Sequence, residues 1–199
     1  DDHDIVLLVY EGTLAKWLAL QGAPTGTGNK ALPAASWMAS SDAASFASAQ
    51  IQVKQSSAAV PSPRRVEWLF DATTDEHIVI GFVVPADYGS APVLKVHYKM
   101  TSAVASTVGW GCKVAAISDG DATDLDADTF AAANGVSVTV PATAGYLDVA
   151  SITITNADAM AAGDDLVMML YRDADGTDYA DAATGDAEFI GAEFQYTKA

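Results

Sequence analysis

The sequence predicts an all-β protein: an antiparallel two-sheet β-sandwich, best described as a jelly roll, with an extended N-terminal arm. Three observations predict this fold. Residues 66–199 contain eight candidate strands. Gly, Pro, Asp or Asn turns bound each strand. No amphipathic segment of about ten residues separates them, as parallel βαβ units would require. Eight strands suit a jelly roll, although the count alone leaves an immunoglobulin-like topology open.

The clearest strand candidate covers residues 94–100, where apolar and polar residues alternate with a period of two. Residues 77–84 and 166–171 are apolar on both faces. The helical candidate in this half is residues 126–133 (DADTFAAA), a turn or two within a crossover loop. The remaining strand candidates are residues 66–70, 110–117, 136–140, 151–155 and 190–196.

The first part of the chain differs from the rest in composition. Residues 5–10 (IVLLVY) predict a strand, and residues 13–21 (TLAKWLALQ) have the apolar spacing of a short helix. Residues 39–63 are rich in Ala, Ser and Gln and end in two prolines, which is typical of a linker. We therefore expect an N-terminal arm or attachment segment over residues 1–65 and a sandwich domain over residues 66–199.

The charge of the chain excludes several classes of partner. Its 199 residues include 26 Asp and Glu against 10 Lys and Arg, a formal net charge of −16. Residues 66–199 hold 21 of the acids and 5 of the bases, which accounts for the whole net charge, whereas residues 1–65 are formally neutral. Nucleic acid and anionic membrane surfaces both require a basic protein surface, so we expect neither as a partner. The acidity keeps the sandwich soluble by repulsion.

The sequence offers little for catalysis, and we expect no enzyme. It contains no Gly-x-Ser-x-Gly elbow, no phosphate-binding loop and only three histidines. The single cysteine, Cys112, excludes an internal disulfide and a Cys-rich zinc site. Its position on the apolar side of a predicted strand indicates a buried, inert thiol.

Two loops concentrate the carboxylates. Residues 119–128 carry five Asp, and Asp173, Asp175 and Asp178 alternate around a glycine. Calcium takes six to eight oxygen ligands, which such a loop can supply in part. The Glu that closes an EF-hand is missing, because Thr184 holds that position. A water-facing acidic hairpin loop is the interpretation we favour, and calcium at Asp173, Asp175 and Asp178 is the one cofactor left open.

Aromatic side chains on a sandwich can stack on sugars, which gives a set of glycan-binding candidates. Trp110 and Tyr98 fall in apolar stripes and are better explained as core residues. Tyr88 and Tyr146 lie in predicted loops, and they remain the candidates for contact with a glycan.

From Val66 onward the chain resembles bacteriophage virion proteins that carry a jelly-roll domain, of the head-decoration, head-fibre or appendage type. The resemblance covers roughly residues 66–199 and rests on the order of several short sequence segments rather than on a catalytic signature. It implies a structural protein without enzymatic residues, and homotrimers are common among such proteins. The segments are WLFDATTD (68–75), IGFVVP (80–85), VLKVHY (93–98), VGWGCKVAAISDG (108–120), VSVTV (136–140) and AAGDDLVMMLY (161–171), with the closing residues 189–196.

In such virion proteins the N-terminal segment commonly attaches the domain to the particle or to sister subunits. By that resemblance, the widely spaced apolar residues of the arm are candidates for partner binding. The alternative is that its aromatic anchors pack on the second half of this chain. The candidates are Ile5, Leu7, Tyr10, Trp17, Leu18, Trp37 and Met38.

The leading expectation is therefore a structural protein on the exterior of a bacteriophage virion, self-associated as a homotrimer. It would bind the major capsid protein or a neighbouring structural protein through its arm. One alternative is a glycan-binding module for host attachment. Another is a subunit of an extracellular filament, in which residues 5–10 insert into the sandwich of the next subunit.

Overall fold

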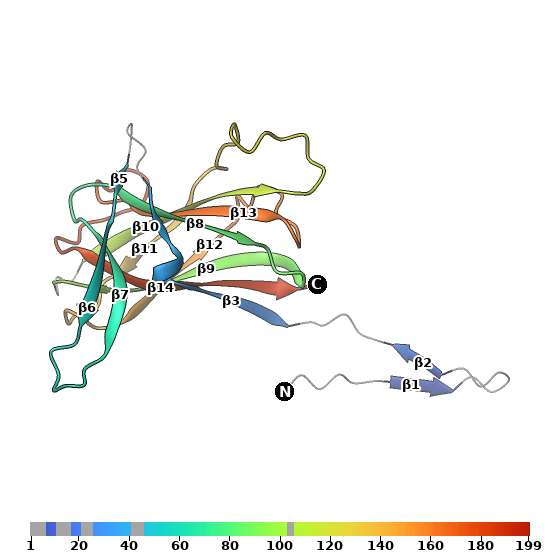
Figure 1. The fold of residues 1–199 in the computed structure, drawn as a ribbon, viewed down its shortest axis with the longest axis horizontal. Helices are drawn as coiled ribbons and strands as arrows, with labels where there is room; N and C mark the ends of the chain where they lie inside the picture. The colour runs from blue at the N-terminus through green and yellow to red at the C-terminus, as the bar shows by residue number, and fades with distance from the viewer. Residues whose placement is uncertain (1–6, 11–16, 21–25, 41–45, 103–105) are drawn as a thin grey trace.

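The computed structural model describes residues 7–10, 17–20, 26–40, 46–102 and 106–199. Their regular secondary structure is β-strand, apart from one 3-10 turn, η1 (Ala34–Ser36) (Figure 1). Eight strands form the body of the molecule: β7 (Arg64–Phe70), β8 (Glu76–Val83), β9 (Tyr88–Met100), β10 (Thr107–Ile117), β11 (Asn134–Thr139), β12 (Asp148–Thr153), β13 (Asp165–Arg172) and β14 (Ala187–Lys198).

These eight strands form two antiparallel sheets packed face to face (Figure 1). One sheet has the order β11-β10-β13-β8, and the other has the order β12-β9-β14-β7. The first strand of the eight pairs with the last, the second with the seventh, the third with the sixth and the fourth with the fifth. This nested pairing is a long hairpin rolled into a sandwich, which is the topology of a jelly roll. The predicted fold is confirmed, and the immunoglobulin-like alternative is excluded.

The boundary predicted at residue 65 is wrong, because much of the expected arm belongs to the two sheets. β3 (Thr27–Pro33) pairs with β14, and β6 (Gln50–Gln55) pairs with β7. Two short strands, β4 (Met38–Ala39) and β5 (Ala47–Ser48), pair with β8. Edge strands need apolar residues on one face only, so the Ala-, Ser- and Gln-rich composition of this segment is compatible with pairing.

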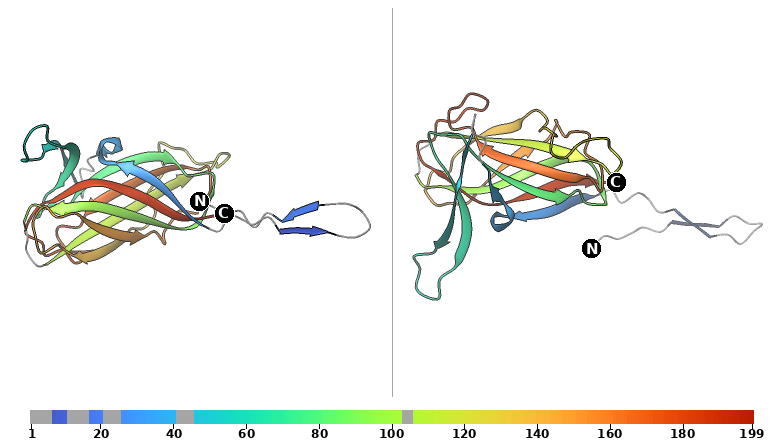
Figure 2. Two further views of the ribbon diagram at one scale, coloured as in Figure 1. Left: turned by 90° about the horizontal axis from the view of Figure 1, so that it is seen from below. Right: turned by 45° about the horizontal axis from the view of Figure 1, so that its top comes forward.

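The two N-terminal strands form a separate sheet. β1 (Leu7–Tyr10) pairs with β2 (Trp17–Leu20) in an antiparallel register that sets Tyr10 opposite Trp17. Figures 1 and 2 show this pair lying away from the sandwich. The helix predicted for residues 13–21 is therefore wrong over residues 17–20, because backbone pairing with β1 overrides a weak helical spacing.

The core between the sheets is built on aromatic side chains. Trp110 and Tyr98 are completely buried, as predicted, and their ring centroids lie 5.5 Å apart. Phe70 meets the edge of Trp110 at 5.2 Å. Cys112 is also completely buried, and burial raises the pKa of its thiol, which keeps it protonated and unreactive.

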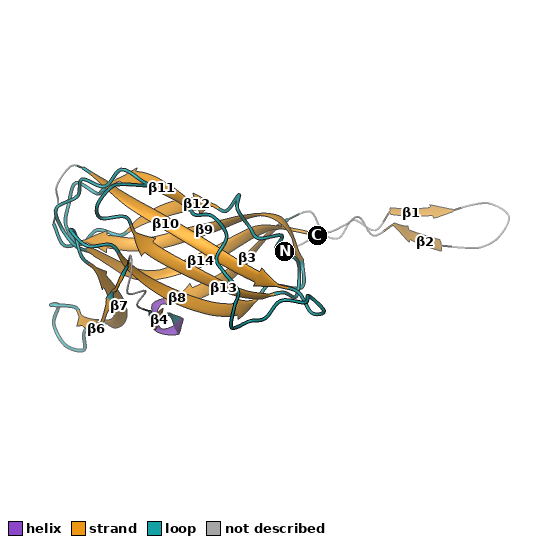
Figure 3. Ribbon diagram, turned by 90° about the horizontal axis from the view of Figure 1, so that it is seen from above, coloured by secondary structure: helices purple, strands orange, loops and turns teal. Residues whose placement is uncertain are grey.

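The long connection between β10 and β11 is a loop rather than the short helix predicted for residues 126–133 (Figure 3). Its aspartates accept hydrogen bonds from nearby backbone N–H groups and so stabilise turns in place of helix. Asp124 accepts the N–H of Asp126 at 3.1 Å, and Asp128 accepts the N–H of Thr129 at 2.8 Å. Within the described residues, no helix has the length and apolarity needed to cross a membrane.

Candidate ligand-binding pocket

A cavity of about 570 Å³ lies on the outer face of the β10–β13 sheet, beneath the loop that joins β10 to β11. Its floor consists of two cross-strand pairs, Ala115 opposite Val167 and Ile117 opposite Asp165. The period of two in a strand directs all four side chains to the same face. The cavity volume falls within the range of small-molecule sites, about 300–1,000 Å³.

The wall of this pocket comes from the loop. Leu125, Asp128, Thr129 and Phe130 line it, and Phe130 remains 38% exposed. The ends of the loop are held in place. The Ser118 hydroxyl donates to Asp164 at 2.7 Å, and a backbone hydrogen bond at 2.8 Å runs from residue 131 to residue 114 of β10. The apolar wall is therefore presented by a loop whose two ends are attached to the sheets.

The chemistry of the pocket is an apolar surface with carboxylate acceptors at its edge. Phe130, Leu125 and Val167 supply exposed apolar area, and Asp128 and Asp165 supply oxygens that accept hydrogen bonds. Carboxylates repel anions, and the net charge of −16 adds to that repulsion. The pocket therefore disfavours anions, and its surfaces match a ligand that has hydroxyl donors and apolar C–H faces.

The sequence interpretation missed this pocket. The sequence pattern predicts an acidic loop over residues 119–128 and a helix over residues 126–133, and neither prediction singles out Phe130. The available signal was the pair of apolar residues, Leu125 and Phe130, inside an otherwise acidic stretch. An aspartate-rich turn that only faces water has no need for either side chain.

The two aromatic residues predicted to contact a glycan differ in their exposure to solvent. Tyr88 begins β9 and is buried, with its ring stacked 6.2 Å from that of Phe194. It is a core residue and cannot serve as a platform for a sugar. Tyr146 lies in the loop before β12 and is 63% exposed, next to the equally exposed Leu147.

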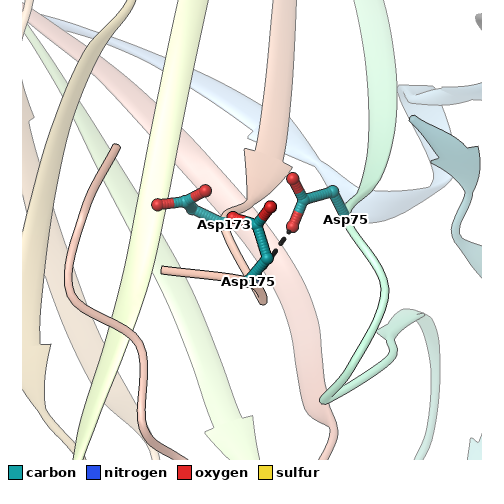
Figure 4. A group of neighbouring side chains, drawn as sticks. All are labelled: Asp75, Asp173 and Asp175. Atoms are coloured by element: carbon teal, nitrogen blue, oxygen red, sulfur yellow. Dashed lines mark hydrogen bonds between the residues drawn. The ribbon is translucent and has the colours of Figure 1, made fainter. Parts of the chain in front are cut away.

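Three aspartates form an acidic cluster at one end of the sandwich (Figure 4). Carboxylate oxygens of Asp75, Asp173 and Asp175 all lie within 4.8 Å of one another. Asp75 accepts the backbone N–H of Asp175 at 3.2 Å, the contact drawn in Figure 4. Asp178, the third residue predicted from the sequence, lies outside this group, and its place is taken by Asp75 from the loop before β8. That pairing was invisible in sequence because about 100 residues separate the two loops.

The electrostatics of this cluster follow from burial. Burial raises the pKa of both Asp75 and Asp173, whereas the hydrogen bonds from Thr177 lower the pKa of the exposed Asp175. Asp173 also stabilises the turn of its own loop, because one of its carboxylate oxygens accepts hydrogen bonds from the N–H groups of Asp178 and Tyr179. Three carboxylates offer only part of the oxygen set that calcium needs, so calcium stays a prediction that melting with and without the ion can test.

The residues predicted to bind a partner are dispersed. Leu7 and Tyr10 lie on β1, and Trp17 and Leu18 lie on β2, whereas Ile5 falls outside the described residues.

The two candidates nearer the sandwich differ from each other. Trp37 is buried, and its ring meets that of Phe189 edge-on at 5.4 Å, so it belongs to the core and is not a contact for a partner. Met38, the next residue, is 57% exposed on β4.

Comparisons with known proteins yield structural likeness only. No protein-family model and no curated protein matches the sequence. The structure is similar to TmCBM61 in complex with β-1,4-galactotriose, with 14% identity, coverage of 81% of this chain and 88% of that one, and a TM-score of 0.38. It is also similar to the family 11 carbohydrate-binding module of the cellulosomal cellulase Lic26A-Cel5E of Clostridium thermocellum, with 12% identity, coverage of 84% and 94%, and a TM-score of 0.43.

A third similar structure is the enzymatically active domain of tailspike protein 4 of bacteriophage CBA120. Identity is 7%, coverage is 82% of this chain and 20% of that one, and the TM-score is 0.40. At such identities and TM-scores, none of these likenesses assigns a function to the chain.

Proposed function

We propose that this chain is a non-catalytic binding module whose sandwich takes a neutral glycan in the pocket beneath the loop between β10 and β11. The observation that carries the proposal is the juxtaposition of Phe130 with Asp128 and Asp165 around a cavity of about 570 Å³. A sugar ring presents apolar C–H groups that an aromatic side chain can cover and hydroxyls that carboxylates can accept from. The pocket supplies both kinds of contact.

A binding role without catalysis agrees with the positions of Cys112 and His77, two side chains that could otherwise take part in chemistry. Cys112 is sealed in the core with a raised pKa, so its thiolate does not form near neutral pH. His77 is buried at the start of β8, on a different strand from the two that floor the pocket. Neither residue lines the cavity, whose lining offers carboxylates, one hydroxyl and apolar groups.

The test is a screen of neutral oligosaccharides against the full chain. We expect at least one to bind, and Phe130→Ala to weaken that binding about tenfold through loss of apolar contact. Asp165→Asn keeps the shape but changes the acceptor, and a smaller loss is expected. Val149→Ala is the control, since it removes an exposed apolar side chain of β12 that does not line the pocket. The proposal fails if no neutral glycan binds, or if Phe130→Ala and Val149→Ala behave alike.

A second function is favoured by the N-terminal hairpin. All eight residues of β1 and β2 are apolar or aromatic (LLVY and WLAL), and within the described chain the two strands pair only with each other. An isolated two-stranded hairpin is marginally stable in water, so a protein partner that covers it would stabilise it. This supports a structural subunit that associates through its N-terminus.

The resemblance to virion jelly-roll proteins suggests where such a subunit would assemble. In this second proposal the hairpin joins sister subunits as a homotrimer, or binds the major capsid protein or a neighbouring structural protein on the exterior of a bacteriophage particle. Glycan binding by the sandwich and attachment by the hairpin are compatible, because they use different parts of the chain.

Removal of residues 1–25 tests the attachment role. The deletion stops before β3, because β3 pairs with β14 and belongs to the sandwich. The shortened chain is expected to lose attachment to particles and to keep any glycan binding. Full occupancy of particles by the shortened chain would contradict the attachment role. Electron micrographs of the native assembly would separate particles from filaments, the third alternative.

A further inference from the structure

β6 is an open edge of the sandwich. The sheet order ends β14-β7-β6, and within the described residues no strand pairs with the outer side of β6. Figure 1 shows β6 and β7 as a long hairpin that extends past the body of the molecule. Exposed edge strands are sites of pairing with another chain, and proteins usually protect them with Pro, several charges or a bulge. Residues 50–55 (QIQVKQ) contain no Pro and one charge.

The hydrogen bonds of the hairpin show which backbone groups are free. The Ser56 N–H donates to the Pro63 carbonyl at 2.9 Å, and the register continues with Gln55 opposite Arg64. Hydrogen-bonded pairs alternate along an antiparallel ladder, so Lys54 and Gln52 direct their backbone groups to β7. Ile51 and Val53 therefore direct their N–H and C=O groups to the open edge.

The same two residues carry exposed apolar side chains. Ile51 is 58% exposed and Val53 is 70% exposed. They stand opposite Trp68 and Val66 of β7 and share one face of the sheet with them. On the other face, Lys54 and Gln52 both contact the Glu188 carboxylate at 3.2 Å. The polar face of β6 is thus attached to the sandwich, and its apolar face is left open.

We propose that β6 pairs with β6 of a second copy of this chain, antiparallel, about a two-fold axis at Gln52. In this register Ile51 stands opposite Val53 of the other copy, so the outward backbone groups meet each other and the exposed apolar side chains are neighbours. Gln50 stands opposite Lys54. The segment is self-complementary, as a two-fold interface requires.

Charge selects both the partner strand and the register. Residues 46–65 contain three bases and no acid, so an acidic second copy meets less repulsion here than it does at the aspartate-rich loops. Centred on Gln52, the two Lys54 residues lie four residues apart along the strands, about 13 Å, beyond the Debye length at physiological salt. Centred on Val53, they would be about 7 Å apart and would repel each other.

A single cysteine on β6 tests the register in the full chain. Gln52→Cys places two thiols across the two-fold axis in a pair whose Cα atoms lie about 4.5 Å apart, within reach of a disulfide. We expect a disulfide-linked dimer under mild oxidation. Gln55→Cys is the matched control, because its two copies would lie about 20 Å apart. The native Cys112 is fully buried and does not compete.

Sedimentation of the full chain tests the contact without a cross-link. Val53→Pro removes only an outward N–H, so the β6–β7 ladder is kept while pairing with a second copy is blocked. We expect this change, and Val53→Lys as a second blocking variant, to weaken association at least tenfold and to halve the mass observed at about 100 µM, a high concentration that suits a short, weakly binding interface. Val83→Ser, which alters another exposed valine (58%) on β8, should leave the mass unchanged.

Two results would overturn the proposal. One is equal cross-linking of Gln52→Cys and Gln55→Cys, or no cross-linking of either. The other is a mass that stays the same in both Val53 variants and in the unaltered chain. Association through the N-terminal hairpin leaves both tests valid, because each reports on β6 alone.

Discussion

Arg172 and Asp181 form a buried bidentate ion pair across the loop that follows β13. Arg172 Nε lies 2.8 Å from Asp181 Oδ2, and Nη2 lies 3.0 Å from Oδ1, with both side chains almost completely shielded from water. The guanidinium also donates to the carbonyls of Ala183 and Gly185, and Asp181 accepts the N–H of Gly109. The pair therefore connects β10, β13 and the approach to β14.

Loss of one member of this pair should be costly. Asp181→Leu leaves the Arg172 charge buried without its counter-ion, and the free energy of unfolding is expected to fall by about 3–5 kcal/mol in urea denaturation. Lys198→Met is the control, because the Lys198–Asp87 pair is partly exposed and 3.6 Å apart, and it should cost less than about 1 kcal/mol. Similar losses in the two variants would contradict the structural role given to Arg172.

Trp37 should behave as a core residue although it lies far from the predicted sandwich in sequence. Trp37→Ala removes a buried ring that packs on Phe189, and a loss of about 3–5 kcal/mol in unfolding free energy is expected. Met38→Ala, one residue away and exposed, should change stability by less than about 0.5 kcal/mol. If both variants change the unfolding free energy equally little, Trp37 does not act as a core residue.

The acidic cluster predicts a dependence of stability on pH. Burial raises the pKa of Asp75 in the folded state, so the folded protein holds its proton more tightly than the unfolded chain. That preference is fully present below the unfolded pKa, near 3.9, and is lost as the pH rises through the higher folded pKa. Asp75→Asn should therefore raise the melting temperature at pH 7, by about 2 °C, and have little effect near pH 3. A lower melting temperature at pH 7 would show that the charge is compensated, for example by a bound cation.

The surroundings of Lys99 predict a contribution to stability with the opposite dependence on pH. Its ammonium lies between the carboxylates of Glu67 and Glu188, all three nearly buried. Burial raises the pKa of Glu188, but the hydrogen bonds and charges of Lys99 and Lys54 outweigh it and hold that pKa below its usual range. This contribution to stability is present above the unfolded pKa of Glu, about 4.3, and is lost as the pH falls through the lower folded value.

Replacement of Lys99 should therefore weaken the protein most at neutral pH. Lys99→Met leaves two neighbouring carboxylates without their cation, and we expect a loss of about 3 kcal/mol at pH 7 that shrinks as these carboxylates become protonated near pH 4. Urea denaturation at the two pH values measures the difference. Lys95→Met, a change to a half-buried lysine on the same strand, serves as the control. A loss that is equal at both pH values would point to packing rather than charge.

Much of the sandwich could be predicted because strand formation leaves a local signal. The alternation of residues 94–100 and the apolar run of residues 77–84 each report on burial within a single strand. Errors fell where that signal is weak or ambiguous. Residues 27–33 carry a glycine and a proline, yet they pair with β14. Residues 126–133 have helix-forming alanines, but aspartate side chains capture the backbone N–H groups next to them.

The candidate sites also include some features that the local sequence predicts and others that it does not. The exposure of Tyr146 and the burial of Trp110 follow from a loop and from an apolar stripe, both of which can be recognised in sequence. The burial of Tyr88 does not, because it depends on Phe194 and Tyr196, more than 100 residues further along the chain. Asp75 joins Asp173 for the same reason, since β8 and β13 pair across the sheet.

By itself, the sequence determined an all-β chain of alternating strands, an acidic surface on residues 66–199, and the absence of a catalytic signature. The tertiary structure decided which strands are neighbours, that Trp37 belongs to the core, that Phe130 and Asp165 line the same cavity, and that β6 has an open edge. The physical reason is that periodicity and charge belong to single segments. A pocket, a buried ion pair or a free edge is a relation between segments, and only the pairing of distant strands creates it.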